Sequence, residues 1–183
     1  IAVMDNQGVA SITIDTAGDG YTSVPTIEIV DGASKFVAIA NGTTNNASLS
    51  IADAKADNTW TAGTALPNSN FTSITYGNGV YVAVGGSGGS GSAATSTDGN
   101  SWVSRTNITL SAGSLSSVAY GAATYVAINT GGNKAATSTN GIVWTEGGTL
   151  PSSNAWASVA YGNGRFVAVA TGSKEVAVSY DKG

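Results

Sequence analysis

The sequence predicts an all-β protein built from four-stranded antiparallel blade repeats of about 42 residues, which form a partial or complete β-propeller after an N-terminal β segment. Three observations support this fold class. Two short motifs recur in step along the chain, the apolar residues alternate or form short runs as in strands, and no stretch has the 3.6-residue period of a helix.

The first motif predicts a hairpin at the start of each repeat. It reads Ser-Ile-Thr-Tyr-Gly-Asn-Gly-Val-Tyr-Val-Ala-Val at 73–84, and related sequences occupy 117–128 and 158–169. Its first half alternates like a strand. Asn-Gly pairs at 78–79 and 163–164 favour the positive φ angles of a type I′ turn. The following apolar run is typical of a strand that is covered on both faces.

The second motif predicts a tight turn and an outer strand. It reads Ser-Thr-Asp-Gly-Asn-Ser-Trp at 96–102, recurs at 138–144 and begins again at 179 without reaching its Trp. Short polar side chains in such a motif bond to their own backbone, so we interpret three residues as structural turn residues. These are Asp98, Asn140 and Asp181.

A tryptophan recurs every 42 residues, which indicates a structural role in each repeat. Trp60, Trp102 and Trp144 form this series of structural aromatic residues. We expect Trp102 and Trp144 to occupy equivalent, largely buried positions on the outer strands of consecutive blades. Loss of either ring would then cost roughly 3–5 kcal/mol.

The repeats define the domain organisation. Residues 1–25 are predicted to form an N-terminal β-strand module, and 26–183 a series of blade-like repeats. The repeats span 26–60 (degenerate), 71–102, 115–144 and 156–183 (truncated). Because a propeller needs about four to eight blades to close, we expect the missing surface to come from continuation of the polypeptide and oligomeric packing, or from a strand at 9–14.

The composition excludes several function classes. Seven basic and eleven acidic residues give a net charge of −4, which argues against nucleic acid as a partner. No apolar stretch reaches the roughly 20 residues of a membrane helix, so membrane insertion is not expected. The chain has no His and no Cys, so it cannot supply a Ser-His-Asp triad, a Cys nucleophile or the usual zinc ligands. The sequence therefore predicts no catalytic, cofactor-binding or metal-binding residue.

Two features could still indicate a ligand site. Gly-x-Gly-x-x-Gly at 86–91 has the form of a dinucleotide fingerprint, but the residues after it read as a strand rather than a helix, so we interpret it as a loop. Trp156 lies outside the Trp series and opens a strand where Phe71 and Leu115 stand in the sister repeats. It is the candidate ligand contact, as a platform for a sugar ring.

The paired motifs resemble Asp-box (BNR-like) β-propeller repeats of bacteriophage virion proteins and bacterial surface proteins. The resemblance covers 71–183 well and 26–60 loosely. Residues 12–26 also resemble the Gly-x-Gly-Tyr-x-x-x-Pro-Thr strand modules of phage structural proteins. Asp-box propellers include sialidases, but Arg105 and Arg165 stand at unrelated repeat positions and form no Arg cluster.

The resemblance implies a non-enzymatic, structural or adhesive component of a phage particle, such as a tail, fibre or capsid-decorating protein. Its location would be the extracellular virion. Its partners would be other virion subunits, in a homo-oligomer, and a host surface glycan. Two alternatives remain open: a secreted or cell-surface bacterial adhesin, and the propeller domain of a larger glycan-processing enzyme.

Overall fold

The computed structural model describes residues 2–5, 8–12, 36–39, 47–51, 60–67, 70–87, 90–105 and 108–180. The chain divides into two compact units, Ile1–Ser34 and Lys35–Gly183. The Gly-x-Gly-Tyr motif, residue 181 and most of the degenerate repeat lie outside the described residues. The described segments contain strands and turns only, and none of them includes a helix able to cross a membrane.

The first unit contains one described hairpin. Strand β1 (Ala2–Asp5) pairs antiparallel with β2 (Gly8–Ile12), and the register shifts once between Val3 and Met4.

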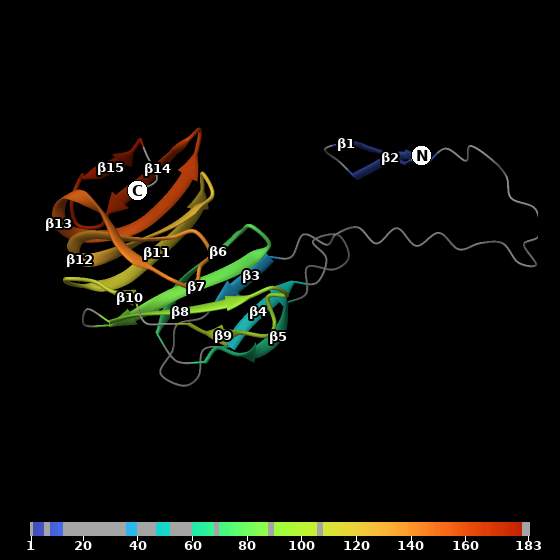
Figure 1. Ribbon diagram of the computed structural model, residues 1–183, viewed down its shortest axis with the longest axis horizontal. Coiled ribbons are helices and arrows are strands. Elements are labelled where there is room, and N and C mark those ends of the chain that lie inside the picture. Colours follow the sequence, from blue (N-terminus) through green and yellow to red (C-terminus); the bar gives the residue numbers. More distant parts are fainter. Residues whose placement is uncertain are drawn as a thin grey trace, which may run out of the picture. The chain divides into compact units, whose positions relative to one another are not determined.

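The second unit contains three described sheets, which we divide into four blades, named 1 to 4, because the last sheet turns from one blade into the next along β13 (Figure 1). Blade 1 is β3 (Phe36–Ile39), β4 (Ala47–Ile51) and β5 (Trp60–Ala65), paired antiparallel in that order. Blade 2 consists of β6 (Phe71–Gly77), β7 (Val80–Ser87), β8 (Ser90–Ser96) and β9 (Val103–Ser104), and the short β10 (Ile108–Thr109) also pairs with β8.

One long strand links the last two blades. Blade 3 contains β11 (Ser114–Gly121), β12 (Thr124–Ser138) and the first part of β13 (Thr145–Gly162). Blade 4 contains the rest of β13, β14 (Arg165–Ala170) and β15 (Val176–Ser179). Strand β13 therefore serves as the outer strand of blade 3 and the first strand of blade 4.

Each complete hairpin turns through two residues with positive φ. The angles are 47° at Asn78 and 78° at Gly79, and 49° at Asn163 and 75° at Gly164. The same turn in blade 3 is made by two alanines, with φ of 47° at Ala122 and 58° at Ala123. The predicted type I′ geometry therefore also forms where the favourable Asn-Gly pair is absent.

The core lies between the blades. One cluster joins blade 2 to blade 3, and a second joins blade 3 to blade 4. Successive residues of β7 serve different clusters, since Val82 packs toward Leu115 while Ala83 packs with Phe71 on the opposite face. This alternation, together with the stacked antiparallel sheets, confirms the predicted blade repeats.

Candidate functional site

The joint between blades 2 and 3 and the joint between blades 3 and 4 each contain a hydroxyl group that donates to the backbone of the next blade. The hydroxyl of Thr72 donates to the carbonyl of Leu115 at 3.0 Å, and that of Ser116 donates to the carbonyl of Trp156 at 2.7 Å. The equivalent position in blade 4 is Ala157, which has no hydroxyl.

The neighbouring hydroxyl accepts from the next blade. The amide of Val118 donates to Ser73 Oγ at 3.1 Å, and the amide of Val159 donates to Ser117 Oγ at 3.1 Å. In blade 4 the equivalent residue is Ser158, whose side chain is exposed. The same acceptor is thus present on blade 4 at its solvent-facing surface.

A tyrosine ring lies against a glycine at each joint. A Cβ on Gly77 would lie 2.1 Å from Cγ of Tyr120, and one on Gly121 would lie 2.0 Å from Cγ of Tyr161. The glycines are therefore required by the close approach of the rings. Gly162 is the equivalent residue of blade 4, and no atom lies within 4 Å of its Cβ position.

One tyrosine strengthens the joint between blades 2 and 3. The hydroxyl of Tyr125 donates to the carbonyl of Gly77 at 2.5 Å, and burial together with the nearby Tyr120 raises the pKa of Tyr125 to about 12. The phenol consequently stays protonated and keeps its donor hydrogen at neutral pH. Phe166 occupies the same place in blade 4 without a hydroxyl.

Blade 4 exposes an apolar face that its sister blades bury. Val82 and Val84 of blade 2 are 0% exposed, whereas the corresponding Val167 and Val169 of blade 4 are 37% and 43% exposed. Val176 and Val178 of β15 add to this face at 57% and 42%. We call these four valines, with Gly162 and Ser158, the open face.

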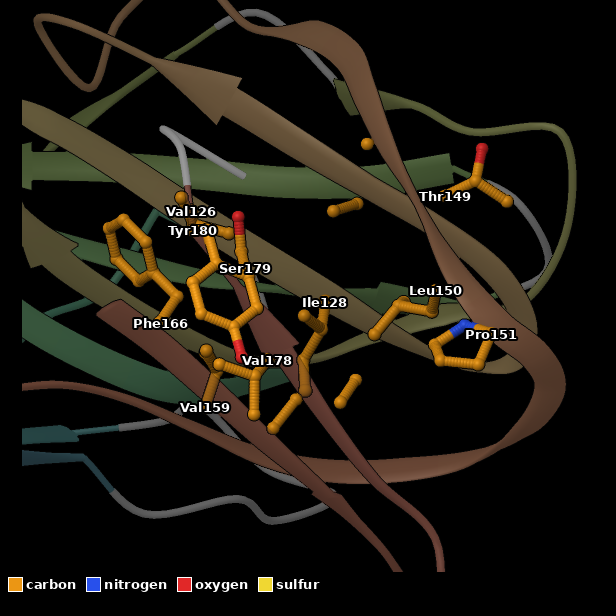
Figure 2. Close-up of a pocket in the computed structure, with 14 residues that line it drawn as sticks. Val126, Ile128, Thr149, Leu150, Pro151, Val159, Phe166, Val178, Ser179 and Tyr180 are labelled. Carbon is orange, nitrogen blue, oxygen red and sulfur yellow. The ribbon is translucent and has the colours of Figure 1, made fainter.

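A pocket of about 400 Å³ lies between blades 3 and 4, beside β15. Its apolar lining includes Ile128, Leu150, Val159 and Phe166, with Tyr180 at the rim (Figure 2). These residues come from β12, β13, β14 and the end of β15, so the pocket is framed by both blades.

Comparison with the preceding joint shows what leaves this pocket empty. Between blades 2 and 3, Ile108 is 2% exposed and Trp144 packs on the same cluster. By the 42-residue spacing of Trp102 and Trp144, Leu150 stands where Ile108 stands in the earlier repeat, and Leu150 lines the pocket. Trp144 packs beside Tyr125 in the earlier joint, and Phe166 is the equivalent of Tyr125. The pocket therefore lies where an aromatic ring packs in the earlier joint.

Trp102 and Trp144, of the periodic tryptophan series, occupy equivalent places in blades 2 and 3. Trp102 and Trp144 are half-buried, and each lies immediately before an outer strand rather than within it. Trp144 packs against Tyr125 with ring centroids 6.4 Å apart, and its indole N–H donates to the carbonyl of Gly141 at 3.2 Å. Each ring caps one side of a joint, so part of it stays in solvent. Nothing is described of the side chain of Trp60.

Trp156 is not a ligand platform in this structure. It is 0% exposed, packs in the cluster between blades 3 and 4, and donates from its indole N–H to the carbonyl of Ser152 at 3.0 Å. Phe71 and Leu115, at the same repeat position, are 0% and 1% exposed. The hypothesis of a ligand contact at Trp156 is therefore wrong, because the position belongs to the core of every blade.

Asp98 is the centre of a self-contained turn. Its carboxylate accepts from the amides of Asn100 at 2.8 Å and Ser101 at 2.7 Å, and from the hydroxyl of Ser96 at 2.9 Å. These bonds, first those from Ser101 and Asn100, hold the pKa of Asp98 well below its usual range. Asn140 accepts in the same way from the amides two and three residues later, at 2.9 and 3.0 Å. Asp181, in the third copy of the motif, lies outside the described residues.

Two further carboxylates with described side chains, Glu146 and Glu175, serve the connections between strands. Glu146 accepts from the hydroxyl and amide of Ser111 at 2.8 Å each, which lowers its pKa. Glu175 accepts from Ser152 and Asn154, which likewise lowers its pKa. Within the described ranges, no three acidic, His or Cys side chains are grouped in a way that could hold a metal ion.

The sequence did not reveal the hydroxyl groups that bond adjacent blades, the glycines that tyrosine rings contact, or the pocket. A sequence signal for the bonding hydroxyl groups existed, since Thr72-Ser73 and Ser116-Ser117 both precede the apolar residues of the first strand.

No protein-family model and no curated protein matches the chain. Among solved structures, it is similar to YCF48 from Cyanidioschyzon merolae at 19% identity and a TM-score of 0.47, over 74% of this chain and 46% of that one. It is also similar to YCF48 bound to D1 peptide at 17% identity and a TM-score of 0.47, over 78% of this chain and 45% of the other. The chain thus spans about half the length of these structures.

Proposed function

We propose that this chain is a non-catalytic structural and adhesive module of a phage particle, acting in a tail, fibre or capsid-decorating protein. The observation that carries the proposal is the open face of blade 4. Its valines occupy positions that the preceding blades bury, and contiguous apolar surface of this kind marks a site of protein contact. In blades 2 and 3 the next blade covers this face, so its chemistry suits packing against another β-sheet surface, which supports a contact role.

The contact features of the blades support this role over a chemical one. The polar side chains that the structure describes at the joints and turns bond to backbone groups. Thr72 and Ser116 hold one blade to the next, and Asp98 closes its own turn. These bonds tie neighbouring blades together and close the turns, which suits a component that must persist outside a cell.

The assignment to a virion rests on the resemblance of the repeats to Asp-box propellers and of residues 12–26 to phage strand modules. In this proposal the neighbours of the chain are other virion subunits, including further copies of itself, since particle proteins act in symmetric assemblies. A host surface glycan is the proposed adhesive target.

Immunogold electron microscopy tests the location. Antibodies raised against the chain should label purified particles at one defined structure, and particles assembled without the chain should lose the label. Label confined to the bacterial envelope would replace this proposal with the surface-adhesin alternative.

Incubation of the purified chain with host polysaccharide tests the non-catalytic part. We expect binding without release of shorter sugars. Turnover that disappears on substitution of one carboxylate, with the fold retained, would assign the chain to glycan processing instead.

A further inference from the structure

The dipeptide Asn-Gly occurs in two different structural environments in the described part of the chain. Asn78-Gly79 and Asn163-Gly164 form the two-residue turns of the β6–β7 and β13–β14 hairpins. Asn140-Gly141 lies in the polar turn that follows β12. The same pair of residues can therefore be compared in two settings within one molecule.

An asparagine that precedes a glycine has a chemical route to modification that needs only water. The backbone nitrogen of the glycine attacks Cγ of the asparagine, and glycine has no Cβ to hinder this approach. The new N–C bond closes a five-membered succinimide ring, and the side-chain nitrogen leaves as ammonia. Water then opens the ring at one of its two carbonyl carbons. The product is aspartate or isoaspartate, each with a new carboxylate in place of the neutral amide.

The polar turn blocks this route at Asn140. The backbone nitrogen of Gly141, which would have to attack, donates to Ser138 Oγ at 2.9 Å, and Gly141 is buried. The side-chain oxygen of Asn140 accepts from the amides of Ile142 and Val143 at 2.9 and 3.0 Å. The attacking nitrogen and the side chain under attack are each held by other partners, so several hydrogen bonds must break before the ring can close.

The hairpin turns do not provide this protection. Both asparagines and both glycines of these turns are exposed, and no atom lies within 4 Å of the Cβ position of Gly79 or Gly164. The strand ladders end at the residues that flank each turn, so the two glycine amides lie outside them. Within the described residues, no hydrogen bond holds the side-chain amide of Asn78 or Asn163. Opening of such a hairpin tip disturbs few contacts.

The exposure of these turns is a property of the repeat. Blade 2 is followed by blade 3, whose Tyr125 bonds to the carbonyl of Gly77 directly before the turn. The turn itself nevertheless remains exposed. The equivalent Ala122 and Ala123 of blade 3 are exposed as well. The tips of these hairpins therefore stay accessible to water where a neighbouring blade packs beside them.

We propose that Asn78 and Asn163 are sites of spontaneous deamidation in the folded chain, and that the polar turn protects Asn140. Modification of both sites makes the net charge more negative than its initial −4. Isoaspartate also adds a methylene to the backbone of a two-residue turn, which opposes the type I′ geometry of the hairpin. The modification accumulates with the age of the protein and alters blades 2 and 4, whereas the alanine turn of blade 3 cannot react. This inference does not rest on the proposed function.

Peptide mapping of the aged chain tests the proposal. The full chain is incubated at mildly alkaline pH, once folded and once in concentrated urea, and the loss of each side-chain amide is followed by mass spectrometry. In the folded chain we expect Asn78 and Asn163 to convert, and Asn140 to convert at least about tenfold more slowly, because its hydrogen bonds must break first. In urea the three residues should convert at similar rates.

Two variants separate the turn from the dipeptide. Ala122→Asn with Ala123→Gly gives blade 3 the turn sequence of its sister blades, and the asparagine introduced at position 122 should deamidate in the folded protein. Ser138→Ala removes the acceptor of the Gly141 amide, so conversion of Asn140 should accelerate at least about threefold. The rates at Asn78 and Asn163 should stay unchanged in both variants.

The proposal is overturned if Asn140 converts as fast as Asn78 in the folded chain. It is also overturned if Asn78 and Asn163 stay intact in the folded chain while all three residues convert in urea. An unmodified asparagine at position 122 of the double variant would contradict the assignment to hairpin tips. An unchanged rate at Asn140 in Ser138→Ala would contradict protection by the Gly141 bond. The double variant keeps the test decisive even if Ser138→Ala weakens the fold.

Discussion

The alanine pair at the β11–β12 turn should be a removable source of strain. Ala122 and Ala123 have φ angles of 47° and 58°, and both are exposed. The left-handed region costs an L-residue about 1–2 kcal/mol, because its Cβ approaches the following carbonyl oxygen. The sister turns place Asn and Gly at these positions, and these residues tolerate such angles. We therefore expect Ala122→Asn with Ala123→Gly to stabilise the protein.

The magnitude follows from two opposing effects. Glycine at position 123 relieves the backbone strain, but it lowers the free energy of unfolding by roughly 0.5–1 kcal/mol because it increases the conformational freedom of the unfolded chain. Asparagine at position 122 relieves part of the strain without this loss. The net gain in the free energy of unfolding should be about 1–2 kcal/mol, which for a domain of this size raises Tm by roughly 2–8 °C.

Thermal and urea unfolding of the double variant measure this gain. The matched control is Gly79→Ala in the β6–β7 turn, where φ is 78° and no atom lies within 4 Å of the new Cβ. It should lower stability by about 1–2 kcal/mol through the backbone alone. If the double variant melts at or below the temperature of the unaltered chain while Gly79→Ala is destabilised, the strain argument for the alanine pair is refuted.

Four further predictions concern the joints and the turn. Gly77→Ala should cost about 1–3 kcal/mol because a tyrosine ring occupies the Cβ position, whereas Gly162→Ala should be nearly neutral in the same urea titration. Ser116→Ala should cost about 1 kcal/mol in urea unfolding through the lost inter-blade bond; an unchanged midpoint would assign no stability to that bond. Gly148→Ile should raise Tm by filling the pocket, and a lower Tm would show that the space cannot accept the side chain. Hydrogen bonds lower the pKa of Asp98 in the folded state, so its stabilising contribution is complete above about pH 4 and is lost as the pH falls through the folded-state pKa. Asp98→Asn should therefore flatten the fall in Tm between about pH 4 and 2 and preserve Tm at pH 7.

The repeat was readable from the sequence because identical chemistry recurs at a fixed spacing. The Asn-Gly pairs and the alternating first strands led to the correct hairpins. The Ala122-Ala123 turn shows that strand pairing on both sides can impose a geometry that the local residues disfavour. The repeat context decided this turn.

The site was harder to predict because it depends on which faces meet. Trp156 seemed exceptional as a residue type, but its position is a core position in each blade, so its size is accommodated by packing. The pocket depends on how β12, β13 and β14 meet, and no motif in the sequence records this. A joint is made by side chains about 40 residues apart, and their meeting depends on how far one sheet is turned relative to the next.

The contact between a tyrosine ring and a glycine has a consequence for how the number of blades can change during evolution. Each repeat carries both halves of the joint, with the glycine facing one neighbour and the tyrosine facing the other, as Gly121 and Tyr120 do in blade 3. Duplication of one repeat would therefore copy a matching pair of surfaces in a single event. The duplicated repeat would pack between its two neighbouring blades without any compensating substitution. The number of blades could therefore change by recombination faster than the sequence of any one blade.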